Sequence, residues 1–108
     1  MPHYTLIKTN GKIINLKSEP SYEETLKLLK CKHLDEYGFG FNYNNIDHHE
    51  AVIVIDDFSL SNNKPLNKVV SDALNRSQYW RNIEAQKCNG DFKVCGDVLV
   101  ITENKIKE

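Results

Sequence analysis

The chain has 108 residues and a formal net charge of −1 at pH 7, with 40% hydrophobic and 27% charged residues. This length suits a single domain, and the composition excludes a disordered or membrane-spanning class of chain. The nearly neutral charge disfavours general binding of duplex nucleic acid, which usually requires an excess of basic residues.

The cysteines and the first residues indicate a reducing compartment. The three cysteines are an odd number, and their spacing fits no zinc-binding motif. The opening residues lack the apolar stretch of a secretion signal, and no run approaches the ~20 apolar residues that span a bilayer. We therefore expect a cytoplasmic protein with free thiols and no membrane association.

The chain is predicted to open with a β-hairpin. Residues 4–8 and 13–16 have the composition of strands. Asn10-Gly11 lies between them and favours a type I′ turn, because both residue types tolerate positive φ.

A short amphipathic helix is predicted over residues 22–30. Ser21 and Glu24 have the spacing of a capping box. The expected apolar stripe consists of Tyr22, Leu26, Leu28 and Leu29. The lysines at the end of this segment are Lys27, Lys30 and Lys32, and we interpret them as complementing the dipole at the helix C-terminus.

The next segment alternates aromatic and small residues. Residues 33–41 predict a strand in which Tyr37, Phe39 and Phe41 share one face and glycines share the other. Glycines at alternate positions allow a second backbone or a flat ligand to lie close. The polar residues 42–50 that follow predict a loop.

The second half is predicted to contain a buried strand, a helix and a closing strand. Residues 51–55 are continuously apolar and β-branched, which is typical of a central strand buried on both faces. Asn67 is the expected cap of a helix that stops near Asn75, and residues 98–101 form another buried strand. The apolar positions of this helix are Leu66, Val69, Val70, Ala73 and Leu74.

These elements predict one α+β domain over residues 1–108. It has a small mixed or antiparallel sheet opened by the N-terminal hairpin, with two helices packed on it. The charged residues 103–108 are expected to form a frayed tail.

Three blocks of sequence share a pattern with known proteins. They are the opening TLIKTNGKIINL with SYEETLKLL, the central AVIVIDDFSLSNNKPLNKVVSDAL, and the closing DFKVCGDVLVI. Together they resemble a small family of unknown function from phages, conjugative elements and large DNA viruses. The resemblance implies an accessory protein of a virus or mobile element that acts inside the host cell. The family supplies no catalytic residues to transfer.

Several polar groups invite metal or enzyme chemistry. The run from Asp47 to Glu50 contains two histidines but none of the usual metal-binding spacings, so we expect a solvated loop and no metal. Asp56 and Asp57 follow a buried strand and could serve a metal-dependent enzyme, although a polar turn explains them as well. Cys31 or Cys95, paired with His33, is a weaker candidate as a nucleophile. We expect no cofactor.

The most suggestive stretch lies within residues 76–93, which show no regular period. It contains Arg76, Tyr79, Trp80 and Arg81. Aromatic rings can stack on a base and arginine can clamp a phosphate, but the same residue types also fill cores and protein interfaces. Both readings stay open at this point.

The leading hypothesis is a non-enzymatic protein that binds a nucleotide-like ligand and sequesters it in host-defence evasion. The expected ligand-binding residues are Arg76, Tyr79, Trp80, Arg81, Tyr37 and Phe39. One alternative is a homodimeric protein–protein interaction module that binds a host protein. Another is a metal-dependent enzyme using Asp56 and Asp57.

Overall fold

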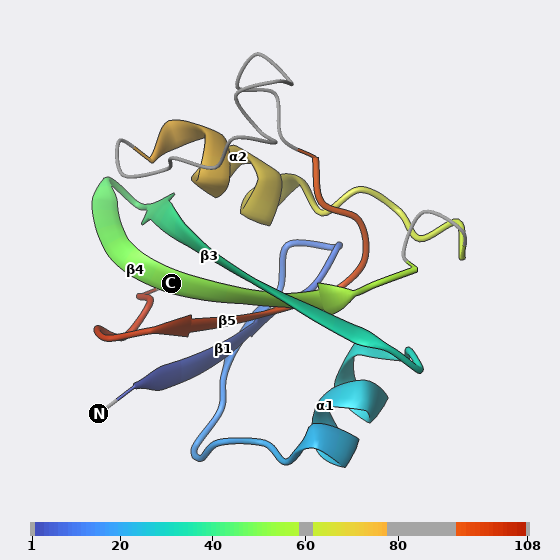
Figure 1. Ribbon diagram of the computed structural model, residues 1–108. Helices are drawn as coiled ribbons and strands as arrows, with labels where there is room; N and C mark the ends of the chain where they lie inside the picture. The colour runs from blue at the N-terminus through green and yellow to red at the C-terminus, as the bar shows by residue number, and fades with distance from the viewer. Residues whose placement is uncertain (1, 59–61, 78–92, 108) are drawn as a thin grey trace.

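A single antiparallel sheet organises the protein. The structure is a computed structural model that describes residues 2–58, 62–77 and 93–107 (Figure 1). In these ranges the strands are β1 (His3–Ile7), β2 (Ile13–Asn15), β3 (Leu34–Tyr43), β4 (Ile46–Asp56) and β5 (Val98–Thr102). Their order is β2-β1-β5-β4-β3, so the last strand in sequence occupies the centre of the sheet.

The two helices lie on opposite faces of this sheet. Helix α1 (Tyr22–Leu29) lies below the sheet and α2 (Lys68–Arg76) lies above it in Figure 1. Because successive residues of a strand point to opposite faces, β5 sends Val98 and Val100 toward α2 and Leu99 toward α1. The predicted α+β fold, with two helices packed on a sheet, is confirmed.

The core is correspondingly divided into two clusters. On the α2 side the buried members are Ile7, Phe41, Ala51, Ile53, Val70, Ala73, Leu74, Val94, Val98, Val100 and Ile106. On the α1 side they are Leu6, Leu29, Val54 and Leu99. The α1 side is thus the more thinly covered of the two faces.

The N-terminal hairpin forms as predicted, but with a different turn. Lys8 N–H donates to Lys12 O, and Gly11 N–H donates to Lys8 O. The loop therefore has three residues, and Gly11 alone among them has a positive φ, of 90°. This arrangement is a type I turn followed by a glycine in the left-handed region, so the predicted type I′ turn is wrong.

The type I′ signature occurs instead in the segment predicted as a polar loop. Asn44 and Asn45 have φ of 52° and 64°, and they connect Tyr43 directly to Ile46. The prediction of a loop over residues 42–50 is therefore wrong, because asparagine tolerates positive φ and closes a two-residue turn here. Most of this stretch is polar because the hairpin that it forms is largely exposed on one side.

Both helix caps are confirmed. Ser21 and Glu24 form the reciprocal capping box, and the Asn67 side chain accepts from Val70 N–H. Tyr22 is an exception to the predicted apolar stripe: it is 62% exposed, and Thr25 is buried in its place. Helix α2 continues past Asn75, because Arg76 is still helical.

The apolar pattern fails at two further places. Leu66 precedes α2, its backbone forms a bridge with Cys95 outside the sheet, and its side chain is exposed. In the C-terminal segment, for which we expect fraying, Ile106 is fully buried in the core. Asn44 Nδ2 also donates to Lys107 O, which ties this segment to the β3–β4 hairpin. No helix in the described part of the chain is long and apolar enough to span a membrane.

Candidate functional site

An open groove of ≈ 820 Å³ lies where the end of α1, the end of β4 and the segment before α2 meet. Its lining residues are Leu26, Lys27, Lys30, Cys31, Lys32, His33, Asp56, Phe58, Asn62 and Lys64. Four lysines and one aspartate therefore face this space, while the chain as a whole is nearly neutral. Its volume falls in the range of small-molecule sites.

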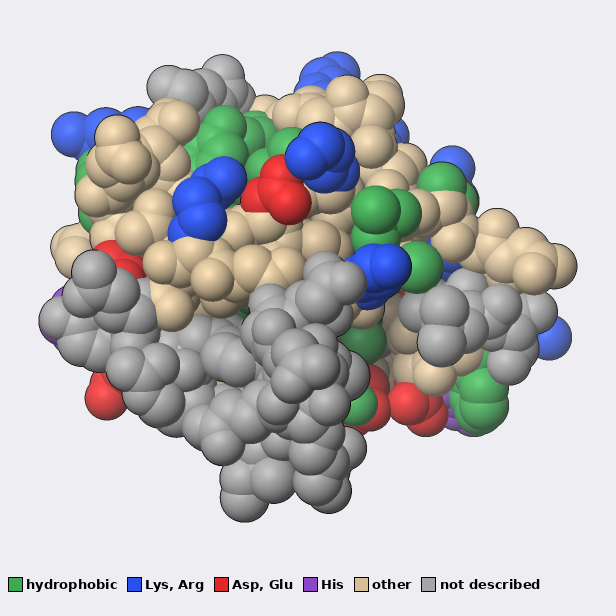
Figure 2. Space-filling view, turned by 90° about the horizontal axis from the view of Figure 1, so that it is seen from above, with side chains coloured by type: hydrophobic (Ala, Val, Ile, Leu, Met, Phe, Trp, Pro, Cys, Tyr) green, Lys and Arg blue, Asp and Glu red, His purple; other side chains and the backbone are tan. Residues whose placement is uncertain are grey.

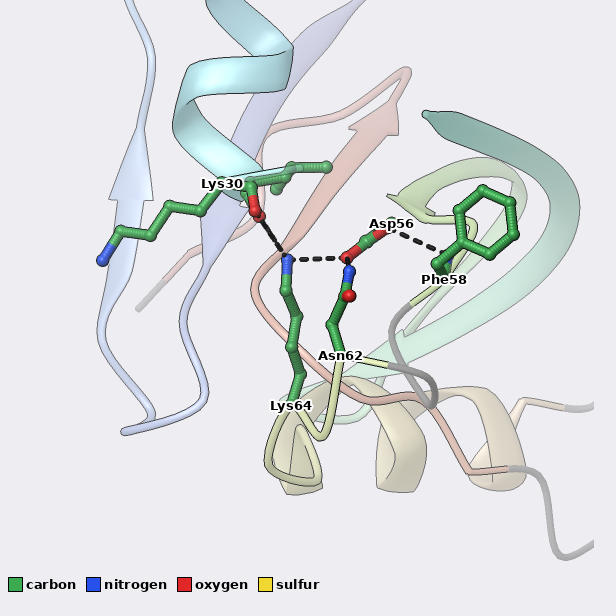
Figure 3. Close-up of polar contacts among 6 residues, drawn as sticks. Lys30, Asp56, Phe58, Asn62 and Lys64 are labelled. Atoms are coloured by element: carbon green, nitrogen blue, oxygen red, sulfur yellow. Dashed lines mark hydrogen bonds and ion pairs between the residues drawn. The ribbon is translucent and has the colours of Figure 1, made fainter. Parts of the chain in front are cut away.

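Asp56 and Lys64 form the inner wall of the groove. Lys64 Nζ lies 2.8 Å from Asp56 Oδ2, and it also donates to Leu29 O at 2.7 Å and Lys30 O at 3.1 Å. Figure 3 shows the ammonium group between the end of α1 and the carboxylate. All three N–H bonds of the ammonium are thereby used.

The Asp56 carboxylate is likewise fully engaged. It is 2% exposed, and it accepts from Phe58 N–H and Asn62 Nδ2 in addition to Lys64. Burial acts to raise the pKa of Asp56, but the hydrogen bonds from Lys64, Phe58 and Asn62 outweigh it and hold the pKa below its ordinary value. A metal ion at Asp56 would have to displace Lys64, so this geometry argues against the metal-dependent enzyme.

Gly96 makes room for the Lys64 side chain. Its φ is 86°, and a Cβ at this position would lie 3.0 Å from Lys64 Cδ. Gly96 N–H donates to Pro65 O, which fixes the segment before α2 against the segment before β5. The glycine therefore satisfies both a positive φ and a close approach.

The outer part of the groove combines positive charge with flat rings. Lys27, Lys30 and Lys32 line it, and among the described residues neither Lys30 nor Lys32 has an acidic partner within ion-pair distance. The rings of His33 and Phe58 meet edge to face with their centroids 5.3 Å apart. Phe58 remains 47% exposed, so its ring is accessible from the groove.

Lys64 determines whether the groove surface is positively or negatively charged. The last carbonyls of a helix carry partial negative charge, which alone would repel an anion. Lys64 neutralises both these carbonyls and Asp56, and the remaining lysines then make the groove positive. The α2 face lacks such a cluster among its described residues: Figure 2 shows its basic side chains separated by acidic and hydrophobic ones.

The Cys31 thiol also lines the groove. Burial, followed by the charge of Asp56, raises the pKa of this thiol above its ordinary value. A thiol with a raised pKa is a poor nucleophile at neutral pH because the thiolate is the reactive form. This disfavours the hypothesis of a catalytic cysteine.

Of the residues predicted to bind ligand, those that the structure describes lie outside this groove. Arg76 is at the C-terminal end of α2, where its guanidinium donates to Asn42 O at 3.2 Å. Tyr79, Trp80 and Arg81 lie outside the described residues, as do Cys88 and the side chain of Phe39.

Tyr37 and Phe39 lie on β3 away from the groove. Their backbones pair with Ile53 and Ala51, and Tyr37 therefore lies on the α2 side of the sheet with Ile53. Phe41, on the same side, is fully buried in the core. Two of the six predicted ligand-binding residues, Tyr37 and Phe39, thus lie on the edge strand β3. Within the described ranges the predicted residues do not come together in one binding site.

The hydrogen bond between Tyr37 and Asp35 on the edge strand β3 can be tested by titration. Its O–H donates to Asp35 Oδ2, and this bond, together with burial, raises the pKa of Tyr37 to about 12. Because the folded state then holds its proton more tightly than the unfolded state, this contribution to stability is complete below pH ~10 and is lost as the pH rises toward 12. Ultraviolet titration should show a tyrosine transition near pH 12 that belongs to Tyr37.

In that titration Asp35→Asn is expected to lower the pKa of Tyr37, whereas Glu36→Gln on the opposite face is expected to leave it unchanged. Tyr37→Phe identifies the transition among the five tyrosines. An unaltered transition in Asp35→Asn would contradict the role of this hydrogen bond.

The histidines near the β3–β4 turn do not form a metal site with their neighbours. His48 is buried against Phe41, and Asp47 accepts from the Ser77 hydroxyl. Among residues 2–58, 62–77 and 93–107, no three His, Cys, Asp or Glu side chains are grouped so that they could hold a metal ion.

Sequence reasoning did not find this groove, although part of its signal was present. The lysines at the end of α1 were explained by the helix dipole alone, and Phe58 and Lys64 lie in a turn-rich stretch without a motif. Lys64 bonds to Lys30 and Leu29, which are 34 and 35 residues away in sequence, and the Phe58 ring meets His33, so only the fold reveals the cluster.

Comparison with known proteins supplies no relative. No family model matches the chain, and no curated protein or solved structure is significantly similar to it. The resemblance to the phage and virus family therefore stays an expectation.

Proposed function

We propose that this protein is a non-enzymatic binding module that captures a nucleotide-like anion in the groove at the end of α1. The observation that carries this proposal is the combination of three lysines with an accessible Phe58 ring around a cavity of ≈ 820 Å³. Lysine ammonium groups bind phosphate as point charges, and an aromatic ring offers a stacking surface for a base.

The inner wall supports binding rather than catalysis. Asp56 and Lys64 satisfy one another, and the thiol of Cys31 has a raised pKa. The groove therefore offers charge and shape without an activated nucleophile among the lining groups described here. In the context that the sequence resemblance implies, sequestering a nucleotide signal would serve an accessory protein in evading host defence.

Calorimetry with a panel of linear and cyclic nucleotides, and with inorganic phosphate, tests the proposal. We expect micromolar binding of at least one nucleotide and weaker binding of phosphate. The double substitution Lys30→Glu with Lys32→Glu is expected to weaken nucleotide binding at least about tenfold, because a tenfold loss corresponds to only ~1.4 kcal/mol. Phe58→Ala should weaken nucleotide binding but not phosphate binding.

The matched control is Lys8→Glu with Lys12→Glu, which makes the same charge change beside the β1–β2 turn. Equal losses in both double variants would show a general charge effect and contradict the groove. If ligand quenches Trp80 fluorescence and Trp80→Phe abolishes binding while the groove variants bind normally, the ligand instead uses the arginine and aromatic residues of the sequence hypothesis. Absence of binding by every ligand in the panel would overturn the proposal.

A further inference from the structure

The described residues cover the α1 side of the sheet only partly. Helix α1 has eight residues and is about 12 Å long, whereas five strands spaced ~4.8 Å apart make a sheet about 24 Å wide. One helix, ~10 Å in diameter, cannot cover this face. In Figure 1, α1 lies under one end of the sheet only. The opposite face is closed by α2 together with Val94 and Ile106.

A row of apolar residues crosses the uncovered part. The strand register aligns Tyr4 of β1 with Ile101 of β5, Ile101 with Val52 of β4, and Val52 with Gly38 of β3. Leu16, whose N–H donates to Tyr4 O, extends the row beyond β2. Its four side chains are half-buried and pack against the α1-side core.

The neighbouring row of apolar residues, which α1 covers, is much more deeply buried. Leu6, Leu99 and Val54 lie one step along the same strands and are almost fully buried next to Leu29 of α1. At the end of the uncovered row, by contrast, Gly38 is exposed, and a Cβ added there would meet nothing within 4 Å. No described residue therefore fills the space next to Gly38 at this end of the row.

Acidic residues surround the row. Glu19 lies beside the Tyr4 phenol, and Glu36 shares the α1 face because its backbone pairs with Val54. Glu50 lies on β4 two residues from Val52, and Glu103 lies just past the end of β5, two residues from Ile101. Both glutamates are exposed and line one small pocket. On the side toward α1, a second small pocket contains Lys17, Lys27 and Glu24.

We infer that this row, bordered by Glu19, Glu36, Glu50 and Glu103, is a docking site for a basic amphipathic helix of a partner protein. The uncovered area has room for one more helix beside α1, and the half-buried apolar row matches the apolar face of such a helix. The four glutamates then face the partner's lysines and arginines, which fixes orientation through charge complementarity.

A second copy of the chain is a poorer occupant. The two described helices already bury leucines against their own sheet, as Leu29 of α1 and Leu74 of α2 illustrate. The partner must therefore supply a helix that is not needed for its own core. This site is separate from the groove at the end of α1, so either proposal can fail without the other.

A fluorescently labelled Leu–Lys amphipathic peptide of about 14 residues, ~21 Å long as a helix, is the probe. Anisotropy titration is expected to show binding of this peptide and none of a Leu–Glu peptide of the same pattern. Glu36→Lys with Glu50→Lys should weaken binding at least about tenfold, ~1.4 kcal/mol. The matched control is the pair Glu23→Lys with Asp72→Lys, which makes the same charge change on the surfaces of α1 and α2 and should leave affinity within about twofold.

Methyl NMR of the wild-type complex identifies the contact directly. Shifts at Leu16, Val52 and Ile101 are expected on addition of the peptide, with little change at Val70 or Leu74 on the other face. Equal weakening by the control pair, or an absence of shifts in the row, would overturn the inference. Sedimentation showing a dimer that dissociates in Glu36→Lys with Glu50→Lys would also overturn it, by making a second copy the occupant.

Discussion

Replacing Asn67 with alanine is expected to lower the free energy of unfolding by about 3–5 kcal/mol. This side chain is fully buried and makes three hydrogen bonds. Nδ2 donates to Ile7 O at 2.9 Å and to Gly96 O at 3.0 Å, while Oδ1 accepts from Val70 N–H at 3.2 Å. Alanine would leave two buried carbonyls and one helical N–H without their partners.

The cost exceeds that of an ordinary helix cap because Asn67 joins three parts of the chain. It links the end of β1, the segment before β5 and the start of α2. Ser21→Ala removes only the exposed cap of α1 and is expected to cost about 1 kcal/mol. Urea denaturation followed by circular dichroism measures both variants on one scale.

Asn67→Asp separates the two roles of the side chain. Aspartate keeps the oxygen that caps α2 but replaces the amide donor with a second oxygen facing two carbonyls. If capping were the whole contribution, this variant would be nearly as stable as the wild type. We expect it to be at least as unstable as Asn67→Ala, and a loss below about 1 kcal/mol in both variants would contradict the assigned role.

Asn67 also shows what sequence can and cannot predict. Its position before an apolar helical pattern predicts the cap, because capping depends on residues three positions apart. The bonds to Ile7 and Gly96 span 60 and 29 residues, and no local pattern encodes them. The same division explains why both helix starts were predicted, whereas the groove at the end of α1 was not.

Errors at the turns have a different origin. Asn10-Gly11 and Asn44-Asn45 are both compatible with positive φ, and local chemistry alone does not decide which pair closes a two-residue turn. The strand register decides it: Ile7 pairs with Ile13 in the first hairpin, whereas Tyr43 pairs with Ile46 in the second. The polar composition of residues 42–50 predicted a loop, but these residues form the exposed end of the β3–β4 hairpin.

Replacing Lys64 with methionine is expected to lower the free energy of unfolding by about 3 kcal/mol, the low end of the range for breaking a buried ion pair. Methionine keeps much of the aliphatic contact but removes the ammonium, so Asp56 and two carbonyls of α1 lose a partner. Lys64 is 17% exposed and Asp56 is 2% exposed, so water can replace only part of what is lost. Lys68→Met, in the exposed pair with Asp72, should cost no more than about 0.5 kcal/mol.

The pH dependence of the Lys64→Met variant distinguishes a lost ion pair from lost packing. In the wild type the folded-state pKa of Asp56 lies below its ordinary value, so its stabilising contribution is present above pH ~3.8 and is lost as the pH falls through the lowered pKa. Without Lys64, burial is opposed only by Phe58 and Asn62, and the pKa of Asp56 should rise. Carboxyl NMR titration measures this shift.

An unchanged pKa would mean that Lys64 acts mainly by covering Gly96 and the end of α1. A raised pKa would show that one ammonium group both holds α1 to the sheet and keeps the groove free of unbalanced negative charge.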